Sequence, residues 1–445
     1  NYYLFDISNI DIKNLNEMKK KYCSMQNIMF AHISCKKTDK GNIMTSNGIG
    51  GGNPLNELNN LKIMTQNISP TQTEEYKLRL LKLRECLQKN KVGGIYINAG
   101  TNLEYFTGVK WPATERMVGA FLTSQGVLSY ILPKFEAGSF GMRILIDGTS
   151  YYWDEHESPY RVIFHLFREN RIDVTDIVAI DPSAPYFLVE GIQKHCHKYK
   201  FISGENFISQ CRSIKSHNEI DIMQCANNMT LEVQKSAASI LYKGITASEV
   251  EDFINQAHRK VGASGSSFCI VLFGKDTSYP HGVQTPKPLE DDDIVIIDTG
   301  CTLYGYQSDI TRCYIFGEPT EKQLQVWQHE KEFQQIAFNA AKIGGKCCHV
   351  DDAVRNFLSS NGYGPGYALP GVAHRTGHGI GMDIHESPYL VGNDDTTLVP
   401  GMCFSNEPML IIPEEFGIRH EDHFYMTESG PKWFTEPMES IVKPF

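Results

Sequence analysis

The order of apolar runs and amphipathic stretches separates two globular parts of the chain. Over residues 71–211, helical patterns alternate with short apolar strand patterns. One such strand pattern, at 177–180, lies between helical patterns at 159–170 and 188–198. This alternation is typical of an α/β domain, which we expect over 71–211.

Residues 212–445 repeat a pattern of two helices followed by strands. Three capping boxes, each a Ser or Thr followed three residues later by Glu or Gln, mark helix starts: Ser216 with Glu219, Thr246 with Glu249, and Thr320 with Gln323. Strand patterns follow each helix pair, around 268–273 and 293–299, and again around 380–386 and 402–411. The repeat predicts an α/β (α+β) domain of two halves related by a pseudo-twofold axis, with a site that draws residues from both halves.

Residues 1–70 lack such a pattern. They are rich in Asn, Lys and Ser and contain the glycine-rich stretch SNGIGGGNP. We expect them to form a disordered or loosely attached extension that takes no part in the chemistry.

Composition and charge narrow the class of protein. The net charge of −10 at pH 7 argues against nucleic acid as a partner. No apolar run reaches the roughly 18 residues of a membrane span. The 12 cysteines form no CxxC pair, which fits reduced thiols. We therefore expect a cytoplasmic protein that binds neither nucleic acid nor membrane.

The stretch IVIIDTGCTLYGYQSDITR, residues 294–312, carries the first candidate site residues. Its apolar, β-branched start predicts a buried strand ending on Asp298. A turn at the Tyr-Gly pair of 304–305 then returns the chain in a second strand that carries Asp309. Two carboxylates brought together in a buried sheet repel each other unless a cation lies between them. The alternative is that one aspartate caps a turn and the other pairs with Arg312.

The second half of this domain supplies further candidate ligands. The stretch GVAHRTGHGIGMDIHESP holds His374, His378 and His385, and later strands carry Glu407 in SNEP and Glu421 in GIRHED. Four buried carboxylates need compensating positive charge, which two divalent cations clamping a bridging hydroxide would supply. An oxygen-rich set with one imidazole favours Mn²⁺, with Co²⁺, Fe²⁺ and Zn²⁺ as further candidates.

Taken in order, the segments DTG…SDITR, HRTGHGIGMDIHE, NEP and IRHED resemble the five-ligand pattern of the pita-bread metallopeptidases. This family includes methionine aminopeptidase, aminopeptidase P, prolidase and the metal-free creatinase. The resemblance covers about residues 212–445 and implies a pita-bread fold, while 71–211, with TNLEYFTG, resemble the creatinase-type N-terminal α/β domain. It also implies that five residues bind two metals, the second and the last of them bridging: Asp298, Asp309, His378, Glu407 and Glu421.

Further matches resemble the proline-specific branch of that family. His281, in SYPHGVQTP, precedes the first ligand at the spacing of that branch, and His374, His378 and His385 form its HxxxHxxxxxxH pattern. The resemblance implies cleavage of Xaa-Pro bonds, most closely the activity of Xaa-Pro dipeptidase (prolidase). In this mechanism we expect Glu407 to pass a proton from water to the proline nitrogen.

The histidines outside the ligand set and one arginine are candidates for substrate binding. His281 and His385 would stabilise the developing oxyanion or steady the substrate. For His281 and His374, orienting the metal ligands is an equal alternative. Arg419 would pair either with the proline carboxylate or with a nearby acidic side chain.

Two other functions remain open at this point. Aminopeptidase P activity on longer peptides is the close alternative, because length selection depends on loops and on a partner subunit. A catalytically inactive peptide- or protein-binding module is the alternative from a different class, although such a module has no need of four costly buried carboxylates. The resemblance also implies a homodimer that acts on short Xaa-Pro peptides.

Overall fold

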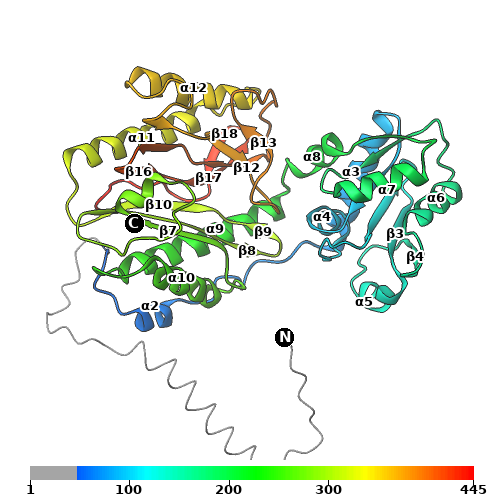
Figure 1. The fold of residues 1–445 in the computed structure, drawn as a ribbon, viewed down its shortest axis with the longest axis horizontal. Helices are drawn as coiled ribbons and strands as arrows, with labels where there is room; N and C mark the ends of the chain where they lie inside the picture. Colours follow the sequence, from blue (N-terminus) through cyan, green and yellow to red (C-terminus); the bar gives the residue numbers. More distant parts are fainter. Residues whose placement is uncertain (1–47) are drawn as a thin grey trace, which may run out of the picture. The chain divides into compact units, whose positions relative to one another are not determined.

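The computed structural model describes residues 48–445, so the expectation for 1–47 lies outside the described residues. Residues 48–70, which we call the strap, differ from the loosely attached extension expected there. Helix α2 (Pro54–Asn60) lies in the strap against α10 (Figure 1). The strap is tied to the C-terminal domain by backbone hydrogen bonds from Gly50 to Ala238 and from Met64 to Val261, both 2.9 Å. Its sparse apolar side chains pack into the domain core, which a search for a sustained period could not detect.

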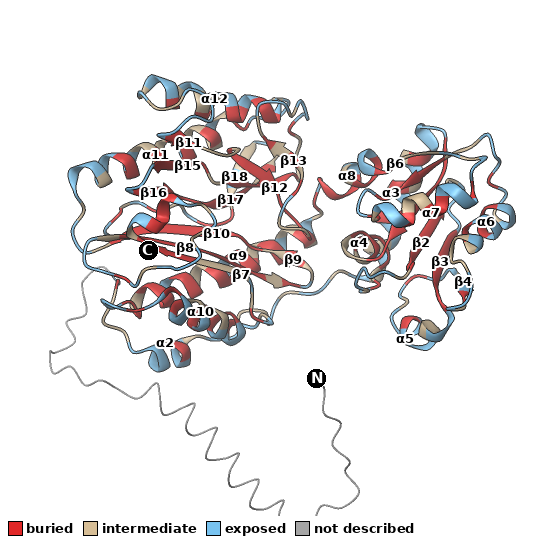
Figure 2. Cartoon of the chain, viewed as in Figure 1, coloured by how far each residue is buried: buried red, intermediate tan, exposed pale blue. Residues whose placement is uncertain are grey.

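The N-terminal domain contains a six-stranded mixed sheet of order β4-β3-β2-β1-β5-β6. Its strands are β1 (Val92–Asn98), β2 (Gly119–Thr123), β3 (Leu128–Pro133), β4 (Thr149–Trp153), β5 (Ile177–Ile180) and β6 (Lys200–Ser203). The helices are α3 (Thr73–Lys89), α4 (Thr101–Thr107), α5 (Ala137–Gly141), α6 (Tyr160–Glu169), α7 (Tyr186–His195) and α8 (Glu205–Arg212). Strands β1, β2 and β3 are buried along their whole length, and Figure 2 shows buried residues concentrated in the sheet. The alternating helices and strands agree with the α/β architecture predicted from the pattern.

The C-terminal domain repeats the order of two helices followed by strands. Its first half comprises α9 (His217–Ser239), α10 (Ala247–Val261), β7 (Ser266–Phe273), β8 (Asp293–Leu303), β9 (Tyr306–Gln307) and β10 (Ile310–Phe316). The helices of the second half are α11 (Glu321–Ala340) and α12 (Cys347–Ser360). The strands that follow are β11 (Gly371–Val372), β12 (Gly377–Gly379), β13 (Glu386–Leu390), β14 (Cys403–Asn406), β15 (Met409–Ile412), β16 (Phe416–Arg419), β17 (Asp422–Thr427) and β18 (Gly430–Trp433). This duplicated order agrees with the predicted halves.

Local sequence signals fix the main helices of this domain. All three predicted capping boxes are formed, at the starts of α9, α10 and α11. Helix α10 ends at Gly262, whose φ of 113° is the left-handed conformation that favours glycine at this position. No helix within residues 48–445 combines the length and apolar character required to span a membrane.

Two strand predictions in the second half are wrong in detail. Residues 380–385 form a turn between β12 and β13, because the β12–β13 pairing shifts register after His378. The predicted strand at 402–411 is divided into β14 and β15. Pro408 lies at this break and has no N–H to continue a ladder. Both interruptions occur beside candidate site residues.

Candidate metal centre

The hairpin of β8 and β10 places the two aspartates side by side. The strands pair antiparallel, with Asp298 opposite Thr311. In the turn, Tyr304 and Gly305 have φ values of 49° and 92°, the left-handed conformations that a tight hairpin turn requires. Asp309 directly precedes β10 and lies close enough to Asp298 for the charge of that carboxylate to contribute, after burial and Glu421, to raising the pKa of Asp309. The hairpin therefore returns the second carboxylate to the first, as its spacing predicted.

Arg312, the alternative partner expected for one of these aspartates, pairs with a different acid. Arg312 forms a buried ion pair of 2.8 Å with Asp422, and it also donates to the backbone carbonyl of Glu421. The two aspartates of the hairpin therefore do not use Arg312 as their counter-ion.

The second half brings three more predicted ligands to this hairpin. His378 lies in β12, and Glu407 follows β14 at the break before β15. Glu421 lies between β16 and β17, and its N–H donates to the carbonyl of Thr311 at 3.2 Å. Because Thr311 belongs to β10, this bridge joins the two halves of the domain at the site.

The ligand atoms of this set lie close together. Asp309, His378 and Glu421 each offer one atom within 4.8 Å of those of the other two. The Nε2 atom of His378 is 3.9 Å from Oδ2 of Asp309 and 3.1 Å from Oε1 of Glu407. Asp298, Asp309, His378 and Glu421 are each at most 7% exposed.

Burial and mutual repulsion perturb the acids of this cluster. Burial, followed by the charges of Glu421 and Asp298, raises the pKa of Asp309 well above its usual value. Burial and the charge of Glu407 do the same to the pKa of Glu421. For Glu407, burial alone would raise the pKa, but the neighbouring His378 holds it below the usual value. Without a cation the cluster therefore holds protons that its carboxylates would ordinarily have lost.

The hydrogen bonds of His378 identify which ring nitrogen faces the acids. Its Nδ1 is 3.0 Å from the carbonyl oxygen of Gly379. A carbonyl can only accept, so Nδ1 carries the hydrogen and Nε2 is the nitrogen that faces Glu407 and Asp309. Because Nε2 faces carboxylate oxygens, a positive charge is required there, either a proton on Nε2 or a bound cation.

Several buried polar atoms at this point have no hydrogen-bond partner among the described residues: Oδ1 of Asp298, Oδ1 of Asp309, Oε1 of Glu421 and Nε2 of His378. Unpaired buried polar atoms are rare in folded proteins and need an explanation. Carboxylate oxygens and an imidazole nitrogen form a donor set that suits divalent cations. The residues present therefore fit a metal centre.

The side chain of Arg419 is bonded to residues of the cluster itself. Its Nη2 forms an ion pair with Oδ2 of Asp298, and its Nε donates to Oγ1 of Thr311 at 3.2 Å. The side chain is only 3% exposed. Of the two roles expected for Arg419, this geometry agrees with the structural ion pair.

The three other predicted histidines surround the same cluster. The ring of His385 meets that of His378 edge-to-face, with centroids 4.2 Å apart. Burial and the His378 ring lower the pKa of His385 to about 4, so His385 is neutral at pH 7. His374 holds its Nδ1 against the carbonyl of Arg375 at 2.8 Å and leaves its buried Nε2 without a partner. His281 is exposed, on the loop after β7, and its charge contributes to lowering the pKa of His385.

Two residues near the site were not recognised from the sequence. Thr311 donates from Oγ1 to Glu421 at 2.7 Å and also accepts from Arg419. Its position two residues after Asp309 puts it on the same face of the strand, a signal that alternation could have supplied. Arg375 stacks over the ring of Tyr389 at 4.4 Å, and its charge reaches His385.

A duplicated α/β domain with a buried cluster of four carboxylates and one imidazole, flanked by neutral histidines, defines a metal-dependent hydrolase. Comparison with known proteins agrees with this class. The model of metallopeptidase family M24 matches residues 221–428, and the creatinase/prolidase N-terminal domain model matches residues 79–214.

Individual relatives match over nearly their whole length. The chain is 29% identical over 371 residues to the Xaa-Pro dipeptidase of Pyrococcus furiosus, covering 82% of this chain and 100% of that protein. It is 30% identical over 383 residues to the probable dipeptidase PepE of Mycobacterium bovis, covering 83% and 97%. The crystal structure of recombinant prolidase from Thermococcus sibiricus superposes with a TM-score of 0.74 at 28% identity, covering 81% and 97%.

The chain belongs to metallopeptidase family M24. Its fold is the pita-bread fold of that family, preceded by a creatinase-type N-terminal domain, which confirms the resemblance and the fold class predicted from the motifs. It is accordingly a peptidase of a kind that uses divalent metal ions.

Proposed function

We propose that this protein is an Xaa-Pro dipeptidase that binds two divalent metal ions through Asp298, Asp309, His378, Glu407 and Glu421. The observation that carries this proposal is the buried cluster of Asp309, His378 and Glu421, whose ligand atoms lie within 4.8 Å of one another and which keeps polar atoms without a hydrogen-bond partner. The neutral histidines around the cluster and the dipeptidases among the relatives support the choice of substrate. As in the family pattern, Asp309 and Glu421 are the proposed bridging ligands.

Bound metal ions would supply Lewis acidity and make a water molecule acidic enough to serve as a nucleophile. The protein's own groups then handle the protons. His378 holds the pKa of Glu407 low against the effect of burial, so Glu407 is ionised and able to accept a proton from water. Glu407 would deliver this proton to the proline nitrogen, which is a poor leaving group until it is protonated.

His385, which is neutral at pH 7, suits the developing oxyanion. It lies against His378 and is exposed, so it can donate a hydrogen bond to a substrate oxygen. His281 is exposed on the loop after β7 and would contact the substrate. His374 keeps a buried unpaired nitrogen beside Glu407 and is proposed to orient that ligand.

The carboxylate of a dipeptide requires a cation, and Arg419 is occupied by Asp298. We propose Arg375 for this role. It is partly exposed, it lies close enough to influence His385, and its guanidinium is held flat against Tyr389. A stacked guanidinium keeps its edge free for a carboxylate, which its planar fork matches.

Several finer assignments belong to the same proposal. An oxygen-rich ligand set favours Mn²⁺, with Co²⁺, Fe²⁺ and Zn²⁺ as further candidates. We propose a cytoplasmic homodimer, in keeping with the reduced thiols and the family resemblance. We divide the chain into a catalytic domain over 212–445 and an N-terminal domain over 71–211, with the strap packed on the former.

Turnover of chosen peptides tests the proposal. The protein would be stripped of metal, reloaded with Mn²⁺ and given Ala-Pro, Ala-Ala and the tripeptide Ala-Pro-Ala. Hydrolysis of Ala-Pro alone is the expected result. Hydrolysis of the tripeptide alone would instead establish an Xaa-Pro aminopeptidase, and metal binding without turnover of any peptide would indicate a binding module.

A further inference from the structure

The turn between β12 and β13 carries His385 and is held from outside by the N-terminal domain. On one side of the turn, the carbonyls of Gly381 and Met382 accept hydrogen bonds from the backbone and side chain of Gln307, at 2.9 and 3.2 Å. On the other side, Asp383 and Glu386, which bracket His385, both reach one guanidinium, that of Arg212.

Arg212 ends helix α8 and is almost fully buried. Its Nη2 lies 2.8 Å from Oδ2 of Asp383 and also contacts Oε2 of Glu386. The second oxygen of Glu386 accepts from Nζ of Lys215 at 2.6 Å. A lysine ammonium is a single point charge, whereas the planar guanidinium can hold two carboxylates in fixed directions.

Arg212 is itself oriented by helix α4 of the N-terminal domain. Its Nη1 donates to the side-chain oxygen of Asn102 at 2.7 Å. Asn102 in turn donates to the buried Asp181 at 2.8 Å. The neighbouring Thr101 donates directly to Asp383 at 2.7 Å. The side chains that fix the turn are thus anchored in the core of the N-terminal domain.

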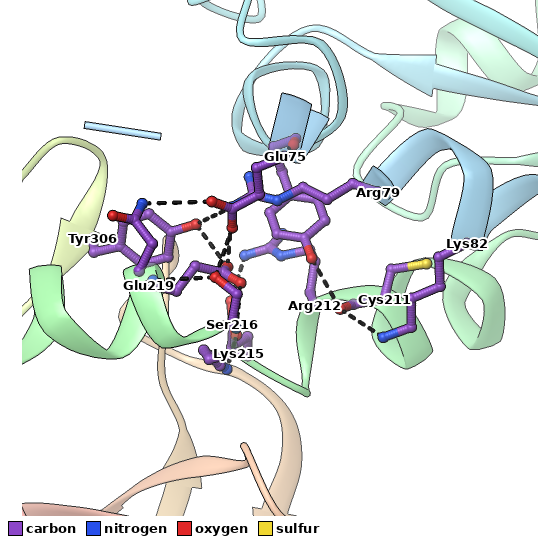
Figure 3. A network of polar contacts seen from close by, with 12 residues as sticks. Glu75, Arg79, Lys82, Cys211, Arg212, Lys215, Ser216, Glu219 and Tyr306 are labelled. Atoms are coloured by element: carbon purple, nitrogen blue, oxygen red, sulfur yellow. Dashed lines mark hydrogen bonds and ion pairs between the residues drawn. The ribbon is translucent and has the colours of Figure 1, made fainter. Parts of the chain in front are cut away.

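A second connection holds the other side of the site. Arg79 in α3 donates to the hydroxyl of Tyr306 at 2.9 Å, and this hydroxyl donates to Glu219 at 2.7 Å. Figure 3 draws Arg79, Tyr306 and Glu219 together with Arg212. Tyr306 precedes Gln307, which binds the His385 turn. The N-terminal domain therefore reaches the turn by two routes, one through Arg212 and one through Tyr306 and Gln307.

We propose that Arg212 is a positioning residue for His385: by clamping Asp383 and Glu386 it sets the place of that imidazole beside the metal cluster. Through Asn102, which holds Arg212, and Thr101, which holds Asp383, the N-terminal domain thereby completes the active site. This inference rests on the proposed function for its kinetic consequences. A displacement of a catalytic group by about 1 Å can cost on the order of a hundredfold in rate.

The kinetic test compares Arg212→Met and Arg212→Lys with Arg116→Met, a control that removes an exposed ion pair in the N-terminal domain. On Ala-Pro, Arg212→Met should lower kcat by roughly 10- to 100-fold with KM within about threefold. Arg212→Lys should recover only part of this loss, and the control should match the parent protein. Asp383→Asn, at a half-exposed position, gives the same test if Arg212→Met does not fold.

A double-mutant cycle separates positioning from general destabilisation. If Arg212 acts through His385, Arg212→Met should cost almost nothing further in a His385→Ala background. Independent, multiplying losses in kcat would overturn the proposal.

A second readout needs no turnover. His385 is exposed, so its modification by diethyl pyrocarbonate can be followed by mass spectrometry. The rate should change severalfold in Arg212→Met and stay constant in the Arg116→Met control; an unchanged rate overturns the proposal. A parent protein that fails to cleave Ala-Pro would refute the proposed function, while this modification rate still decides the role of Arg212.

Discussion

Metal binding should release protons from the carboxylate cluster, because the metal-free protein keeps acids protonated that a cation must ionise. Asp309 and Glu421 both have a pKa well above the usual value, owing first to burial and then to neighbouring carboxylates. Arg419 is the cation paired within the cluster, and its ion pair with Asp298 leaves the other acids uncompensated. A ligand carboxylate must lose its proton to bind a cation.

The sign and size of the effect follow from linkage. A carboxyl with a raised folded-state pKa favours the metal-free fold most below its unfolded pKa of about 4, and this contribution is lost as pH rises through the raised value. Metal affinity therefore increases with pH over the same window. Each proton displaced changes the apparent binding free energy by about 1.4 kcal/mol per pH unit.

Titration calorimetry of the stripped protein with Mn²⁺, at several pH values and in buffers of different ionisation enthalpy, counts these protons. We expect protons to be released on binding, in a number that falls as pH rises, and fewer of them for Asp309→Asn. Glu330→Gln removes a buried acid with a raised pKa that is not among the proposed ligands, so it should leave the count unchanged. Metal binding at the site with no proton release would refute the interpretation of the electrostatics.

Four further substitutions test separate parts of the structure. Glu407→Gln should lower kcat for Ala-Pro by about 10²- to 10⁴-fold with little change in KM, as expected on loss of a general base; an unchanged kcat would exclude that role. Arg375→Met should raise KM for Ala-Pro by about 10- to 100-fold but not KM for Ala-Pro amide, whereas Arg419→Met should instead lower the free energy of unfolding by about 3–5 kcal/mol. If Arg419→Met raised KM for Ala-Pro and Arg375→Met did not, Arg419 would be the residue that binds the proline carboxylate. Asn53→Ala should destabilise the strap by about 1 kcal/mol through loss of the α2 cap, measured by urea denaturation.

Features encoded by neighbouring residues could be predicted from the sequence. The capping boxes of α9, α10 and α11 depend on residues three positions apart, and all three are formed. The hairpin that carries Asp298 and Asp309 could be predicted because its turn and its apolar strand are contiguous. The expected ligand set rested on motifs in a known order, and the structure brings ligand atoms of three of these residues, Asp309, His378 and Glu421, within 4.8 Å of one another.

Features that depend on distant partners could not be predicted in this way. The pairing of Arg419 with Asp298 joins strands that are far apart in the chain. From the sequence alone, binding of the proline carboxylate was an equal alternative for Arg419. Similarly, nothing local to Arg212 indicates that its partners are Asp383 and Glu386. The strap has too few apolar residues to show a period, because only a few of its side chains pack into the core of the C-terminal domain.

The strap also limits how the N-terminal domain can move. The chain enters this domain from the strap, at residues 70–71, and leaves it at residues 211–212, so two covalent crossings connect it to the catalytic domain. These crossings lie near each other, since the side chains of Glu75 and Ser216 are hydrogen-bonded at 2.7 Å. A domain attached at two adjacent points has fewer ways to rotate than a domain attached at one. Any rotation that separated the domains would break the hydrogen bonds of Thr101 with Asp383 and of Asn102 with Arg212, and it would thereby release the His385 turn.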